Sequence, residues 1–273
     1  MSGESGPKVA AVVARACSES ERPEARSPVV LVCDHASNHL PARYGSLGLT
    51  ADGLLAHFAW DPGALALSRR LSALLDAALI YGCVSRLALD VNRRPSDADS
   101  IVETVDGAPV PGNAGLSAAE RERRVAEIYA PYHAALEDLL TKRLRQNRPS
   151  ALVAVHTYTP SLRGIARPWH CGVIFASDSR LGVALVNALR AEDGLIVGVN
   201  TPYAPSDGVY HTMSLHGEAR GNPAVMIEVR NDLVSNEDSQ NAWAMRLAPL
   251  LQTAARTGLD NRDTKPPKTQ PIA

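Results

Sequence analysis

Short apolar runs alternate with stretches of helical periodicity along this chain, and this alternation restricts the possible folds more than any other feature. Continuous apolar runs of this length are typical of strands that are covered on both faces. The runs are PVVLVC (28–33), ALIYGCV (78–84), RLALDV (86–91), ALVAVH (151–156), CGVIFA (171–176), LIVGV (195–199) and AVMIEV (224–229).

Helical patterns occupy several of the intervals. In residues 61–78 leucines recur at helical spacing, and Pro62 suits the first turn of a helix. The sequence SAAE at Ser117–Glu120 is a capping box, which predicts the start of a long helix. Two more helices are expected at about 180–191 and 238–254. Strands alternating with helices predict an α/β fold with helices on both faces of the sheet. Because some neighbouring runs have no helix between them, we expect a mixed sheet.

The domain organisation follows from composition. Hydrophobic residues make up 45% of the 273 residues, enough for a sizeable core, and we expect one catalytic domain over 28–256. Residues 1–27 are rich in Ser, Glu, Arg and Pro and are predicted to form a flexible arm. The polar, Pro-rich segment 257–273 is predicted to be a disordered tail. The long loop at 94–115 is of the kind that often carries function.

Charge and cysteine content exclude some classes of protein. A formal net charge of −1 argues against a nucleic-acid partner. No apolar run approaches the roughly 18 residues of a membrane span, so we expect no membrane partner. The 4 cysteines form no C-x-x-C pair, which favours reduced thiols in a cytoplasmic protein.

Polar groups follow or end four of the apolar runs. Asp34-His35, Asn92-Arg93, His156 and Glu228 all lie at such places, where ligands bind in open α/β sheets. A single histidine in such a place is more often structural, but four convergent cases favour a site. Two imidazoles and a carboxylate suit Zn²⁺, and a second carboxylate can accept a proton from water. Arginine beside such a site indicates a substrate that carries a carboxylate.

These segments resemble the N-formylglutamate amidohydrolase family, in the expected order from Val29 to Val234. The matching segments are CDHASNHLP (33–41), WDPGA (60–64), SRLALDVNRRP (85–95), YAPYHAAL (129–136), AVHTYTP (154–160) and RGNPAVMIEVRNDL (220–233). The resemblance implies a three-layer α/β/α fold with a mixed central sheet, similar to that of zinc carboxypeptidases and aspartoacylases. It also implies zinc ligation by His35 and His156, acid–base catalysis by Glu228, and substrate binding by Arg86, Asn92 and Arg93.

The third metal ligand is open at this point. Carboxypeptidase-like sites use H-x-x-E, but here Asn38 stands where the glutamate would be. Asp61 is the candidate, although an aspartate before Pro62 is also a good helix N-cap. The alternatives are Asn38 and a second water. His216 is a further candidate for substrate binding, with helix capping as the structural interpretation.

Two arginines past His156, Arg163 and Arg167, can contact an acidic substrate, but we expect a solvated loop there. Together, the candidate site residues and the family resemblance imply a zinc-dependent amidohydrolase acting on an N-acyl, N-formylglutamate-like amino acid. One alternative is a non-catalytic small-molecule binding protein on the same scaffold. The other is a metal-independent hydrolase, which the absence of a G-x-S-x-G motif disfavours.

Overall fold

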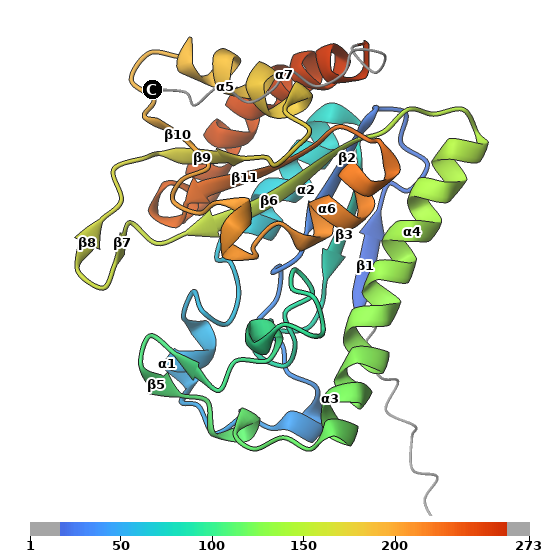
Figure 1. The fold of residues 1–273 in the computed structure, drawn as a ribbon. Coiled ribbons are helices and arrows are strands. Elements are labelled where there is room, and N and C mark those ends of the chain that lie inside the picture. The colour runs from blue at the N-terminus through green and yellow to red at the C-terminus, as the bar shows by residue number, and fades with distance from the viewer. Residues whose placement is uncertain (1–16, 261–273) are drawn as a thin grey trace, which may run out of the picture.

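The computed structural model describes residues 17–260, which form a mixed α/β fold around one central sheet (Figure 1). The strands follow the order β1-β3-β2-β6-β11-β9-β10. The strands β3, β2, β6 and β11 are parallel, β1 and β9 are antiparallel to their neighbours β3 and β11, and β10 is parallel to β9. The predicted mixed sheet is confirmed. The strands are β1 (Ser18–Glu21), β2 (Val29–Cys33), β3 (Ala78–Gly82), β6 (Ala151–Tyr158), β9 (Cys171–Ile174), β10 (Val197–Val199) and β11 (Ala224–Arg230).

Helices cover both faces of the sheet, as expected for a three-layer fold (Figure 1). One face packs on α2 (Ala64–Leu75), α5 (Arg180–Arg190) and α7 (Glu237–Asp260). The other packs on α4 (Ala130–Arg145) and α6 (His211–His216). Successive residues of β2 point to opposite faces, so Leu31 joins the first core cluster and Val32 the second. Both faces are therefore buried, which explains why the strands are continuous apolar runs.

The long helix starts where the capping box predicts. Ser117 Oγ accepts a hydrogen bond from the Glu120 N–H at 3.2 Å, and α3 (Ala118–Arg124) follows. A π-helical segment, Val125–Tyr129, then leads into α4. Pro131 in the first turn of α4 has no N–H to donate, which accounts for the wider turn before it.

One predicted strand is wrong. Residues 86–91 form turns, because side chains compete with a strand ladder for the backbone N–H groups. Ser85 Oγ accepts from the N–H of Leu87 at 3.2 Å, and Asp90 Oδ1 accepts from the N–H of Asn92 at 2.9 Å. Asn92 and Arg93 therefore follow a rigid turn rather than a strand.

The domain limits also differ from expectation. Residues 18–21, expected in the flexible arm, form β1 because they pair with β3. The guanidinium of Arg143 donates to the carbonyls of Ala25 and Ser27, which fixes the end of that segment. Residues 257–260, expected in the tail, continue α7. The rest of the predicted arm and tail, 1–16 and 261–273, lies outside the described residues.

Smaller elements lie beside the sheet (Figure 1). They are α1 (Ala51–Leu55), the hairpin of β4 (Thr104–Val105) with β5 (Ala108–Pro109), and the hairpin of β7 (Ser161–Leu162) with β8 (Ile165–Ala166). The β4–β5 hairpin lies within the long loop at 94–115. Within 17–260, no helix combines the length and apolar character needed to cross a membrane.

Candidate metal centre and active site

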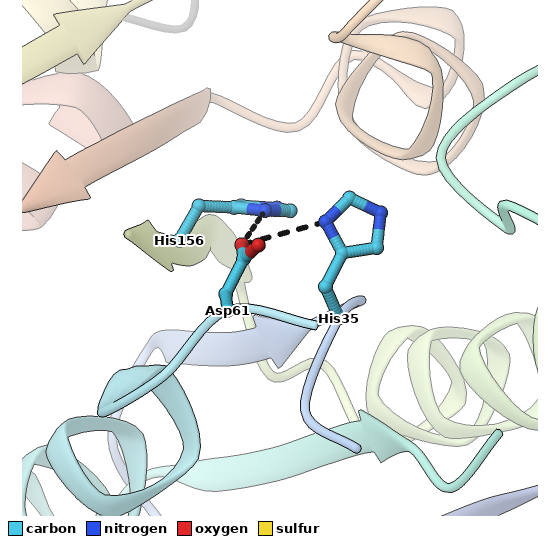
Figure 2. Close-up of side chains that lie close together, drawn as sticks. All are labelled: His35, Asp61 and His156. Carbon is cyan, nitrogen blue, oxygen red and sulfur yellow. Dashed lines mark hydrogen bonds and ion pairs between the residues drawn. The ribbon is translucent and has the colours of Figure 1, made fainter. Parts of the chain in front are cut away.

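Two histidines and one aspartate meet near the carboxyl ends of β2 and β6 (Figure 2). His35 follows β2 by two residues and His156 lies near the end of β6, and the two strands are parallel neighbours. Asp61 lies in the turn before α2, where its N–H donates to the His35 carbonyl at 2.9 Å. All three residues are buried, with at most 3% of their surface exposed. The turn therefore brings the carboxylate against two imidazoles from neighbouring strands.

A second carboxylate lies behind each imidazole. Asp90 Oδ1 lies 2.7 Å from His35 Nε2, and Asp34 Oδ2 lies 2.9 Å from His156 Nε2. Ionised carboxylates only accept hydrogen bonds, so Nε2 carries the proton in both rings. Each Nδ1 then faces Asp61 Oδ2, at 3.4 Å from His35 and 2.9 Å from His156. This is the arrangement of histidine metal ligands that are oriented by outer carboxylates.

These donor atoms fit a metal cation. The ligand atoms of His35, Asp61 and His156 all lie within 4.8 Å of one another. His35 Nδ1 and Asp61 Oδ1 are sealed from solvent and have no hydrogen-bond partner. With neutral imidazoles every atom that faces the centre is an acceptor, and only a cation or a proton satisfies them together. Nitrogen and oxygen donors in this number suit a Zn²⁺ site.

The pKa shifts of His156 and Asp61 also indicate that this site favours positive charge. Burial alone lowers the pKa of His156, but its hydrogen bonds to Asp34 and Asp61 raise it well above the usual value. Burial alone raises the pKa of Asp61, but the charges and hydrogen bonds of His35 and His156 hold it well below its usual range. The carboxylate of Asp61 is therefore ionised and available as a ligand.

The geometry favours Asp61 over Asn38 as the third ligand. Helix α2 begins at Ala64 with Gly63 as its N-cap and no side-chain cap, so Asp61 does not cap it. The Asn38 amide is partly exposed and donates to the Leu54 carbonyl at 3.0 Å. Asn38 is thus bonded to α1, and the side-chain hydrogen bonds seen for it within residues 17–260 do not include the two histidines.

Glu228 lies beside this cluster. It pairs in register with His156 across β11 and β6, and only 4% of its surface is exposed. Burial raises the pKa of Glu228 to about 7, and its Oε2 has no hydrogen-bond partner. Arg230, the partner expected in a structural role, bonds to Asp232 instead, with Nε 2.8 Å from Oδ1. Glu228 is therefore a buried carboxylate suited to accept and return a proton near neutral pH.

In the segment predicted to bind substrate, Arg86 and Arg93 form ion pairs with aspartates. Arg86 Nη2 donates to Asp90 Oδ2 at 2.5 Å, and Nη1 lies 3.8 Å from Asp61. Arg93 Nε lies 2.8 Å from Asp99, without hydrogen-bond geometry. The Asn92 amide accepts from the Thr212 N–H at 2.9 Å and donates to a loop carbonyl. The substrate roles of these three residues stay predictions.

His216 contacts another histidine. Its Nε2 lies 2.9 Å from His133 Nδ1, and its Nδ1 lies 3.7 Å from Glu137. Its hydrogen bonds and ion pairs, as far as residues 17–260 show, do not include the candidate metal ligands. Substrate binding by His216 stays a prediction, and these contacts favour a structural role.

Sequence reasoning missed the two outer carboxylates. Asp34 also accepts hydrogen bonds from Tyr132 Oη at 2.7 Å and Thr212 Oγ1 at 2.8 Å, so it joins β2 to α4 and α6. Burial alone raises its pKa, but the hydrogen bond and charge of His156, the charge of His35 and the hydrogen bond from Tyr132 lower it to about 2. The signal in the sequence was the placement of Asp34 and Asp90 next to the apolar runs, which alone does not identify their histidine partners.

Comparisons with known proteins identify the family of this chain. The profile of the N-formylglutamate amidohydrolase family matches residues 27–235. The crystal structure of a gene product of Agrobacterium tumefaciens is 39% identical, with a TM-score of 0.86 over 89% of this chain and 96% of that one. An N-formylglutamate amidohydrolase from Ralstonia eutropha JMP134 is 20% identical, with a TM-score of 0.69 over 89% and 98%. The comparison with curated proteins found no match. Since the family profile spans most of the chain, the protein belongs to the N-formylglutamate amidohydrolase family.

Proposed function

We propose that the chain is a zinc-dependent amidohydrolase that cleaves an N-formyl amino acid carrying a carboxylate, such as N-formylglutamate. The observation that carries the proposal is the cluster of His35, Asp61 and His156, in which His35 Nδ1 and Asp61 Oδ1 have no hydrogen-bond partner, with Glu228 on the neighbouring strand. Membership in the family supports amide hydrolysis, and the donor set supports zinc.

In this proposal His35, Asp61 and His156 hold the metal, which supplies Lewis-acid chemistry by polarising the amide carbonyl and making water more acidic. Glu228 accepts a proton from the attacking water and passes it to the amide nitrogen. The C–N bond then breaks, which yields formate and the free amino acid. A pKa of about 7 lets one carboxylate perform both proton transfers at neutral pH.

Arg93 is proposed to bind the carboxylate of the substrate. Its side chain is 11% exposed, and its partner Asp99 is 53% exposed. A partly exposed ion pair contributes little to stability, so a substrate carboxylate can replace Asp99 with a small loss of free energy. Arg86 forms ion pairs with Asp90 and Asp61. Its proposed contribution to the reaction is a positive charge near the reacting carbonyl.

A substrate panel tests the proposal. Zinc-loaded protein is assayed with N-formyl and N-acetyl derivatives of acidic and neutral amino acids, before and after treatment with a chelator. We expect hydrolysis of N-formyl substrates that stops on zinc removal and returns on zinc addition. Turnover that ignores the chelator indicates a metal-independent hydrolase, and zinc and substrate binding without turnover indicates a binding protein. Either result refutes the proposal.

A further inference from the structure

Arg167 is a buried arginine without an acidic partner. Only 7% of its surface is exposed, although we expected a solvated loop at this position. Its guanidinium lies 5.6 Å from the ring centre of Tyr158 and 5.0 Å from that of Tyr203. Nη1 also donates to Thr159 Oγ1 at 3.4 Å, near the limit for a hydrogen bond. No carboxylate in residues 17–260 forms an ion pair with Arg167, so its charge is left for another anion.

The other buried arginines differ. Arg143 donates to three backbone carbonyls and the Ser150 hydroxyl, and Arg124 donates to the Ala88 carbonyl, Asn113 and Glu120. These contacts use the guanidinium donors inside the fold, which is how a structural arginine is stabilised. Aromatic faces attract the charge of Arg167, and the side-chain acceptors that it has, the hydroxyls of Thr159 and Tyr203, carry no negative charge to neutralise it. Each guanidinium nitrogen of Arg167 either is accessible to solvent or has a hydrogen-bond partner. A small anion can therefore reach the donors that have no partner.

The position of Arg167 connects it to the active site. It follows the β7–β8 hairpin, which comes directly after the strand that carries His156. Burial raises the pKa of Tyr203, and the charges of both Glu228 and Arg167 act on the same phenol. The Tyr158 ring, 5.6 Å from the guanidinium, belongs to the same strand as His156 and lies two residues after it. The guanidinium is therefore placed beside the strand end that carries His156.

We infer that Arg167 binds a second carboxylate of the substrate, on its side chain, and thereby selects acidic N-acyl amino acids over neutral ones. The inference rests on the proposed function, in which Arg93 binds the first carboxylate. Of the three arginines near the site, Arg86 is neutralised by two aspartates and Arg93 by one. Arg167 has no such partner and has a planar fork that matches a carboxylate.

The test compares N-formylglutamate with N-formylglutamine, which has nearly the same shape and one negative charge fewer. Wild-type enzyme is expected to prefer N-formylglutamate in kcat/KM. Arg167→Gln should lower kcat/KM for N-formylglutamate by roughly 10- to 100-fold, the weight of a charge-assisted hydrogen bond, and leave N-formylglutamine unchanged. Arg167→Lys should recover part of the preference. The control is Arg163→Gln, because the Arg163 side chain, on the β7–β8 hairpin just before Arg167, is 75% exposed, and this variant should behave as wild type.

Equal losses for both substrates, or no loss for either, would show that Arg167 only supports the fold, and would overturn the inference while leaving the proposed function intact. If wild-type protein hydrolyses neither substrate, the proposed function fails instead. Calorimetric titration of both proteins with free glutamate and glutamine then decides the role of Arg167. A preference for glutamate that Arg167→Gln removes supports the inference, and equal affinities in the wild type refute it.

Discussion

Asp90 connects a candidate metal ligand to an arginine, which makes Asp90→Asn an informative substitution. Its Oδ1 accepts from His35 Nε2 at 2.7 Å, and its Oδ2 accepts from Arg86 at 2.5 Å. The side chain is 6% exposed, so water does not replace these contacts easily. Asparagine keeps the size and one acceptor oxygen but removes the negative charge.

The expected decrease in zinc affinity has two causes. An uncharged oxygen holds the imidazole N–H less strongly, so His35 Nδ1 becomes a weaker and less well oriented donor. The amide group also leaves the charge of Arg86 uncompensated, 3.8 Å from Asp61, where it opposes a cation. Loss of an outer partner lowers metal affinity by about 10- to 100-fold, or about 1.4–2.7 kcal/mol. Because both effects act in the same direction, we expect a value near the upper end.

The assay is a competition titration of zinc against a chromophoric chelator, with the fold checked by circular dichroism. The control is Asp99→Asn. Asp99 also forms an ion pair with an arginine, Arg93, but its side chain is 53% exposed and it is not bonded to a histidine of the site. Asp99→Asn should leave zinc affinity unchanged. If correctly folded Asp90→Asn protein binds zinc as tightly as the wild type, Asp90 does not orient His35.

The remaining predictions concern the ligand set, the proton shuttle and acid stability. In the same titration Asp61→Asn should weaken zinc binding far more than Asn38→Ala, and the reverse order would exclude Asp61. Glu228→Gln should keep zinc and lose roughly 10²- to 10⁴-fold in turnover, and near-normal turnover would refute its role. Burial lowers the pKa of both His133 and His216 from 6.5 to about 4. As the pH is lowered, these imidazoles therefore bind protons in the unfolded state before they do so in the folded state. The free energy of unfolding should fall as the pH decreases from about 6.5 to 4, by up to roughly 3 kcal/mol for each histidine. Urea unfolding of His216→Gln should show a smaller fall, and an equal fall would contradict this.

The sheet was predictable because both of its faces are buried. Strands such as β2 and β6 then have no polar alternation to obscure them, and their apolar runs stand out in the sequence. The failure at residues 86–91 has the same origin, since Leu87 and Leu89 are buried without belonging to a strand. The competing hydrogen bonds come from the side chains of Ser85 and Asp90, and a hydrophobic pattern does not contain them.

The histidines of the site were predictable for a related reason. His35 and His156 follow or end neighbouring parallel strands, so the order of the strands alone brings them to one edge of the sheet. Asp61 was harder to predict, because its position depends on how the turn before α2 packs against both strands. Its N–H bond to the His35 carbonyl fixes that turn, and such a contact between distant segments leaves no mark in the local sequence.

The orientation of the two rings has a consequence for the ligand set that the sequence does not give. Asp90 and Asp34 occupy Nε2 of His35 and His156, so only the Nδ1 atoms remain for a metal. Both Nδ1 atoms face Asp61, and a cation bound to both therefore contacts the Asp61 carboxylate as well. Asn38 is tied to the Leu54 carbonyl and would have to break that bond to compete. The aspartates behind the histidines thus favour Asp61 as the carboxylate that would complete a metal site with them.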